Sequence, residues 1–131
     1  MYTFLNIFFF VFHSVLIVFI LVGWVWKKTR MAHLVLVTLT ALSWFGLGIW
    51  FGFGYCPCTD WHWRVRMQLG FYDMPTSYIK FLIDRPTGWD VSPRFVDAST
   101  LVLFLAVAAA SVCLNLHGDT FRKVSPKSPP Q

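Results

Sequence analysis

Residues 2–26, YTFLNIFFFVFHSVLIVFILVGWVW, contain no charged side chain. At a rise of about 1.5 Å per residue, a helix of this length exceeds the roughly 30 Å thickness of the hydrocarbon core of a bilayer. The stretch lacks the basic start and the small-residue cleavage site of a signal peptide. We therefore expect it to remain in the protein as a membrane-spanning helix.

Two further apolar runs follow the first. Residues 31–55 lie between the basic KKTR and the polar CPCTD, and residues 96–116 carry only Asp97 at their edge. The 131-residue chain is 56% hydrophobic and 13% charged, and its apolar residues are gathered in these runs rather than spread as in a soluble core. This pattern predicts an all-α integral membrane protein in which one domain, residues 1–116, contains three transmembrane helices.

The connection between the second and third spans, residues 56–95, contains five basic and four acidic residues. We expect it to form an outer lid that includes a short interfacial or re-entrant helix over residues 75–83, which are too few to cross a bilayer. Pro75 suits the first turn of that helix and Pro86 lies beyond its end. Residues 117–131 end in RKVSPKSPPQ, which predicts a disordered basic tail.

The positions of the basic residues predict the orientation in the membrane. Lys27, Lys28 and Arg30 lie between the first two spans, and further basic residues lie in the tail. Because cytoplasmic loops are enriched in Lys and Arg, we expect the N-terminus outside and the C-terminus in the cytoplasm. These anchors, which meet anionic lipid, account for most of the formal charge of +5, so no nucleic-acid partner is expected.

Small residues in the second and third spans predict close helix packing. Gly48 and Gly52 form a GxxxG pair, and Ala106 and Ala110 repeat the same spacing. Such residues let helix backbones approach closely where lipid provides no hydrophobic drive. We expect them to hold the bundle together.

His13 lies near the middle of the first span, seven residues after Asn6 and therefore on the same helical face. An ionisable group at that depth normally faces a partner. One reading is a proton relay or a cofactor ligand. The reading that we favour is a hydrogen bond between helices, to Thr40, Ser43 or Ser111.

A haem with two histidine ligands would need both imidazoles at one depth. His13 is central, whereas His33 lies near the cytoplasmic end of the second span, about ten residues or ~15 Å away along a helix. His33 and His117 share a boundary and form the alternative pair.

The stretch GYCPCTDWHWRVR, residues 54–66, places four potential metal ligands at every second position: Cys56, Cys58, Asp60 and His62. In a strand they would share one face, but neighbours on that face are nearly 7 Å apart, too far for one tetrahedral ion without a turn. The stretch also lacks the C-x2-C spacing of zinc knuckles. A metal is therefore not the expected reading.

Two other readings of this stretch remain. Cys56 and Cys58 are a thiol pair, although C-x-C closes a strained ring and redox enzymes generally use C-x-x-C. The structural reading is a short helix capped by Thr59 or Asp60 and ended by Gly70, with Arg64 and Arg66 at the lipid headgroups. Apolar and polar residues alternate over 61–69 as in a strand, so the choice between helix and strand stays open.

The chain resembles a family of small bacterial inner-membrane proteins catalogued as a domain of unknown function. The resemblance rests on His13, the join GWVWKKTRMAHL, the CPCT motif and the segment RVRMQLGFYDMPTSYIKFL. It implies a compact helical bundle in the inner membrane and no established activity. By this resemblance the positions worth testing are His13, His33, Cys56 and Thr59. The family usually has an apolar residue at the place of Cys58 and a carboxylate near His62, so neither a Cys pair nor a metal site is implied.

These observations favour a small accessory or interaction subunit of a larger membrane assembly over an enzyme. The expected partners are the lipid bilayer and either other membrane proteins or further copies of the chain. The alternative is a membrane redox or cofactor-binding protein that uses the intramembrane histidines or the Cys56 region, and an oligomeric transporter is third. No cofactor is expected under the first reading, and haem or zinc would belong to the second.

Overall fold

The computed structural model describes the backbone of residues 1–124 and the side chains of residues 1–116. Over these residues the regular structure is entirely helical, which confirms the predicted all-α class and settles residues 61–69 as mostly helix. The elements are α1 (Tyr2–Val22), α2 (Arg30–Ala41), η1 (Leu42–Leu47), α3 (Gly48–Phe51), α4 (Pro57–Gln68), α5 (Tyr78–Thr87) and α6 (Pro93–Val124).

Within the described residues, three helical stretches are long and apolar enough to cross a membrane: Tyr2–Val22, Arg30–Phe51 and Pro93–Leu116, with mean hydropathies of 2.7, 1.9 and 2.1. They correspond to the three predicted spans, although the first two end four residues early. The second ends at Phe51 because Gly52 has a φ of 99°, a backbone conformation that L side chains rarely adopt.

The turn after α1 allows the first two spans to approach closely. Gly23 is buried, and a Cβ atom placed there would lie 2.6 Å from the carbonyl oxygen of Phe19 and 3.0 Å from the ring of His33. The Thr29 hydroxyl donates to the Gly23 carbonyl over 2.7 Å, which fixes the turn before α2 begins.

The second span contains a π-helical segment, η1, between α2 and α3. Beyond α3 the chain folds back, because the Ser43 hydroxyl of η1 donates to the carbonyl oxygen of Tyr55 over 2.7 Å. The segment that leads into α4 therefore lies beside the second span rather than beyond its end.

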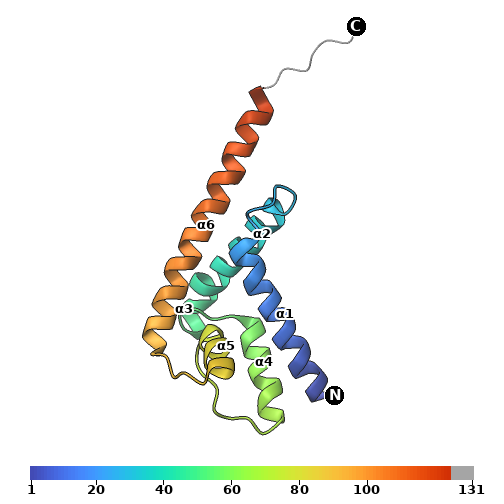
Figure 1. Ribbon diagram of the computed structural model, residues 1–131, viewed down its shortest axis with the longest axis vertical. Helices are drawn as coiled ribbons and strands as arrows, with labels where there is room; N and C mark the ends of the chain where they lie inside the picture. Colours follow the sequence, from blue (N-terminus) through green and yellow to red (C-terminus); the bar gives the residue numbers. More distant parts are fainter. Residues whose placement is uncertain (125–131) are drawn as a thin grey trace.

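Figure 1 shows α1 and α6 spreading apart toward their N-terminal ends, with α4 and α5 in the space between them. α4 packs along α1, α5 packs beside α6, and α2 packs against α6. Two buried regions result. One lies between α2 and α6 and includes Val37, Phe104 and Val107; the other lies between α1, α4 and α5.

The helix predicted over residues 75–83 is displaced along the chain. α5 runs from Tyr78 to Thr87, its N-cap is Ser77, and Pro86 lies within its last turn rather than beyond it. Proline is accommodated at position 86 because the helix ends directly afterwards, at Gly88, which has a φ of 67°.

The helix that contains the third span continues beyond the predicted end of that span. The helix α6 reaches Val124, so the predicted disorder of residues 117–131 is wrong for its first part. The remainder, residues 125–131, lies outside the described residues.

The predicted packing residues lie elsewhere than expected. Gly52 is no longer helical, so Gly48 and Gly52 do not form a GxxxG face; instead the Gly52 amide donates to the Gly48 carbonyl and closes the helix end. Ala106 lies on the exposed side of α6, and Ala110 is half-buried. The side of α6 that packs on α2 carries Phe104, Val107 and Ser111, because these residues recur at intervals of three and four.

Candidate functional site

A buried cluster of aromatic and ionisable side chains lies between α1, α4 and α5. His62 of α4 is completely buried, and His13 of α1 and Tyr78 of α5 are 8% and 6% exposed. The ring of Tyr78 contacts both imidazoles, with centroid distances of 4.1 Å to His13 and 5.7 Å to His62. Phe81 of α5 lies against His62. We call these four residues the His–Tyr cluster.

His62 is anchored to the first helix. Its Nε2–H donates to the side-chain oxygen of Asn6 over 2.9 Å, which leaves Nδ1 as a buried atom with no hydrogen-bond partner. Burial, the positive charge of Arg66 and the nearby His13 lower the pKa of His62 to about 4. The imidazole is therefore neutral at pH 7.

His13 does not make the predicted hydrogen bond between spans. Its Nε2 lies 3.9 Å from the sulfur of Cys56, and its Nδ1 is buried without a partner. The prediction of Thr40, Ser43 or Ser111 as its partner is wrong, because those hydroxyls bond to Leu36, Tyr55 and His33. The chain that folds back after α3 brings Cys56 to this place instead.

The phenol of Tyr78 is the third polar group of the cluster. Burial raises its pKa to about 12, against the smaller opposing effects of the Ser14 hydroxyl and of Arg66. The Ser14 hydroxyl is near enough to act on that pKa, yet no hydrogen bond of good geometry joins the two oxygens. The cluster thus combines neutral hydrogen-bonding groups with several polar atoms that lack partners, an arrangement typical of ligand or water sites.

His33 lies in the other buried region and is not part of this cluster. Its Nε2–H donates to the carbonyl oxygen of Ile20 over 2.7 Å, and its Nδ1 accepts from the Ser111 hydroxyl over 2.9 Å. Both ring nitrogens are occupied, which makes His33 a structural link. The side chain of His117, its predicted alternative haem partner, lies outside the described side chains.

The four alternating ligand candidates are separated by the helical geometry of α4. Cys56 is the N-cap and Pro57 is the first helical residue, so the prediction of Thr59 or Asp60 as the cap is wrong. Asp60 forms an ion pair with Arg64 over 3.0 Å, away from the buried His62. Among the residues with described side chains, no three His, Cys, Asp or Glu residues are close enough to share a metal ion. Thr59 is half-buried in the first turn.

The two cysteines of the stretch are free thiols and are both half-buried. Burial, and next the adjacent Cys56, raise the pKa of the Cys58 thiol, so this group stays protonated at pH 7. The end of α4 agrees with expectation, since Gly70 follows it with a φ of 84°.

Sequence reasoning missed Arg66 and Lys80, which are 5% and 8% exposed. Arg66 was expected at the lipid headgroups, but its guanidinium lies over the rings of Phe71 and Phe81. Helical spacing would have separated it from Arg64, because residues two apart lie on opposite sides of a helix. The Lys80 ammonium donates to Asp84, to Asp90 and to the carbonyl of Val91, at 2.7 to 2.8 Å.

Comparison with known proteins bears out the resemblance seen in the sequence. No curated protein and no solved structure matches the chain. A family model does match residues 3–116, which include every helix that lines the His–Tyr cluster. The chain therefore belongs to the family described as "Protein of Unknown function (DUF2784)".

Proposed function

We propose that the protein is a small accessory subunit of a membrane assembly in the bacterial inner membrane, with its N-terminus outside and its C-terminus in the cytoplasm. The observation that supports this function is an ion pair on the exposed side of α4, between Asp60 and Arg64.

The ion pair lies alongside the first span rather than beyond its end. The start of α4 is beside the middle of α1, since Cys56 contacts His13, and further along α4 His62 contacts Asn6. Asp60 lies between these two contacts. It is therefore level with the N-terminal half of α1.

A lipid-facing surface does not suit such a pair. Charged side chains at membrane depth normally face protein or a water-filled cavity, because hydrocarbon cannot solvate them. The side chain of Arg64 is 69% exposed, so the described part of this chain does not cover it. A polar surface of another subunit, or of a second copy of this chain, would cover it.

The turn between the first two spans supports the proposed orientation. Lys27 and Lys28 are exposed in this turn, which lies at the end of the bundle opposite to α4 and α5. The positive-inside rule favours the cytoplasm for this end, and α4 and α5 would then lie in the outer half of the molecule.

Site-specific photo-crosslinking in cells tests the proposal. Trp61 of α4, 56% exposed, is replaced by p-benzoylphenylalanine, and the matched control is Val18 of α1, which is also 56% exposed. We expect a discrete adduct from position 61 that weakens when Asp60→Asn and Arg64→Gln are added. An adduct of twice the chain mass would identify a second copy as the partner. Equal adducts from both positions, or none from position 61, would contradict the proposal.

A specific observation supports cofactor binding as a second candidate. Two imidazole Nδ1 atoms of the His–Tyr cluster, those of His13 and His62, have no hydrogen-bond partner among the described residues, and the half-buried thiol of Cys56 lies 3.9 Å from the Nε2 atom of His13. Buried polar atoms of this kind are costly unless something pairs with them. Haem can bind through one or two imidazoles, so it fits such residues. Zinc needs at least three protein ligands, and no three described His, Cys, Asp or Glu side chains are close enough to supply them.

The absorption spectrum and metal content of the protein in mild detergent test this candidate. A Soret band, or one metal per chain, that is lost in a His13→Phe variant would favour cofactor binding. A bare protein spectrum without bound metal would leave the subunit reading in place.

A further inference from the structure

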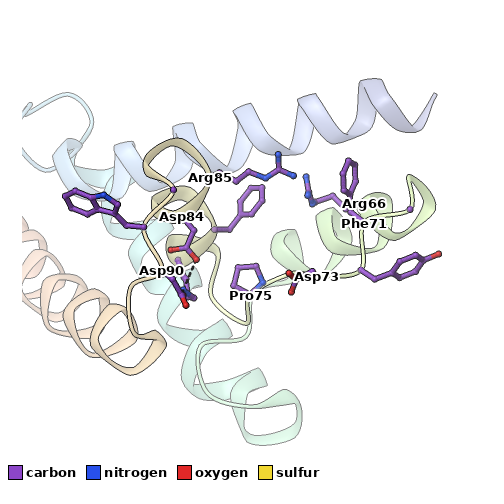
Figure 2. Close-up of a pocket in the computed structure, with 13 residues that line it drawn as sticks. Arg66, Phe71, Asp73, Pro75, Asp84, Arg85 and Asp90 are labelled. Carbon is purple, nitrogen blue, oxygen red and sulfur yellow. Dashed lines mark hydrogen bonds and ion pairs between the residues drawn. The ribbon is translucent and has the colours of Figure 1, made fainter.

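Arg66 and Arg85 lie together at the end of the His–Tyr cluster. The guanidinium carbon of Arg66 lies 4.5 Å from the ring centroid of Phe71 and 4.9 Å from that of Phe81, and Arg85 lies over the same rings at 5.7 and 5.6 Å. Figure 2 shows the two side chains reaching toward each other from α4 and α5. Two like charges are thus held side by side.

Neither arginine has a carboxylate partner among the described side chains. The ion pairs there join Arg64 to Asp60 and Lys80 to two other aspartates. Arg66 is only 5% exposed, and its Nε atom has no hydrogen-bond partner among the described residues. A buried charge without a counter-charge is costly, and the neighbouring Arg85 adds to the effect of burial in lowering the pKa of Arg66.

The two arginines line an open hollow of about 790 Å³ between α4 and α5. Three carboxylates also line it, those of Asp73, Asp84 and Asp90. Lys80 binds two of them, and Asp73 is exposed without an ion pair to either arginine. Among the cations that line the hollow, Arg66 and Arg85 are therefore the two without a carboxylate partner.

A second hollow, of about 430 Å³, is lined by the same two arginines and by Asn6, Ile7 and Phe10 of α1. Apart from Asn6 and the arginines its lining is apolar: Ile7, Phe10, Phe81, Leu82 and Pro86. The arginines thus stand where a polar hollow meets an apolar groove along a spanning helix. This is the shape of an amphiphile whose anionic head is bound next to its hydrocarbon chain.

We propose that Arg66 and Arg85 bind a phosphate group, supplied by an anionic phospholipid whose acyl chain lies in the groove beside α1. Guanidinium groups suit this ligand, because each offers two parallel N–H donors to phosphate oxygens. The phosphate would provide the missing counter-charge and a partner for the Arg66 Nε atom. The site does not depend on the protein partner proposed for Asp60 and Arg64.

The test uses full-length, delipidated protein in a neutral detergent, and it measures the melting temperature as each probe is added. The probes are phosphatidylglycerol, phosphatidylcholine and inorganic phosphate. A ligand that binds only the folded protein raises its melting temperature. We expect phosphatidylglycerol to raise the melting temperature of the wild-type protein more than phosphatidylcholine does.

Arg85→Gln is the informative variant, because Arg85 is exposed and its loss leaves the buried core intact. We expect it to weaken phosphatidylglycerol binding about tenfold or more, as the loss of one charged hydrogen-bond donor would. The matched control is Arg94→Gln, which removes an exposed arginine of α6 that lines neither hollow and should bind like the wild type. Arg66→Gln should bind still less, provided that it folds.

The three probes separate the sources of the phosphate. An equal shift with inorganic phosphate, lost in Arg85→Gln, would support a phosphate site but assign it to a free phosphate. No Arg85-dependent shift with any probe would overturn the proposal. An equal loss of binding in Arg94→Gln would also overturn it, since that result would reflect general surface charge.

Discussion

The Nδ1 atom of His33 lies 2.9 Å from the hydroxyl oxygen of Ser111, although the two residues are 78 positions apart in the chain. Both side chains are completely buried, and their hydrogen bond joins α2 to α6. Polar contacts of this kind hold spanning helices together where hydrophobic packing gives no advantage over lipid.

Ser111→Ala should therefore destabilise the bundle by about 0.6 to 1.7 kcal/mol, the range typical of hydrogen bonds between membrane helices. The loss leaves the His33 Nδ1 atom without its donor. Detergent-induced unfolding followed by circular dichroism measures the change. Ser99→Ala, on the exposed side of α6, is the control and should have little effect. Equal stability of the two variants would show that the contact does not form.

The pH dependence of stability should reveal His62. Its pKa is lowered to about 4 in the folded protein, whereas an unfolded histidine has a pKa near 6.5. Between these values the unfolded chain binds the extra proton, so His62 contributes stability that is complete above about pH 6.5 and is lost toward pH 4. The slope for one proton is about 1.4 kcal/mol per pH unit.

The measurement compares the unfolding free energy of the wild type and of His62→Gln from pH 7 to pH 4. The difference between the two proteins isolates His62 from the other histidines. It should shrink as the pH falls. A difference that stays constant over this range would contradict the buried, neutral state of His62.

Lys80 should keep the connection between α5 and α6 in a fixed conformation. Its ammonium binds Asp84 within α5, and Asp90 and Val91 beyond it, so it joins the helix to the following segment. Lys80→Met should accelerate proteolysis between Gly88 and Ser92. Lys27→Met, an exposed lysine of the first turn, is the control and should leave cleavage unchanged. Equal cleavage of the two variants would show that Lys80 does not hold the segment.

Gly52 should be intolerant of a side chain for conformational reasons alone. Its φ of 99° and ψ of 148° belong to a region that is essentially restricted to glycine, yet a Cβ atom there would meet nothing within 4 Å. Gly52→Ala should cost about 1 to 3 kcal/mol through backbone strain. Gly46→Ala is the control, since Gly46 has equal space but lacks a positive φ, and it should be nearly neutral. The free energies of unfolding in detergent would decide between these expectations.

The three apolar helices could be predicted because bilayer thickness sets the length of a spanning segment. Their ends could not be placed as well, since residues 52–55 continue the apolar composition of the second span after its helix has stopped at a glycine. Composition does not distinguish an apolar helix from an apolar segment that folds back.

The buried side of α4 could not be predicted, because polar residues of this helix are buried while an apolar one is exposed. His62 and Arg66 are buried among aromatic rings, while Trp61 is 56% exposed. Residues 61–69 alternate as in a strand, but the residues that share the buried side are four apart, as in a helix. Only the position of α4 against α1 and α5 selects that side.

The sequence predicts only some of the residues of the candidate site. His13, Cys56 and His62 do lie in one region. The sequence indicates His13 because an ionisable group within a span is costly, and Cys56 and His62 because they are potential metal ligands at alternating positions. Tyr78 and Arg66 were missed as members of this region, since nothing in the local sequence indicates that α5 covers α4.

α4 folds back along α1 through the hydrogen bond between His62 and Asn6. A double-mutant cycle with Asn6→Leu and His62→Phe, measured by detergent-induced unfolding, is the decisive experiment for this placement. We expect a coupling energy of about 0.5 kcal/mol or more between the two positions, because either change alone removes the same hydrogen bond. Strictly additive effects would show that the two side chains do not meet and would contradict the placement of α4.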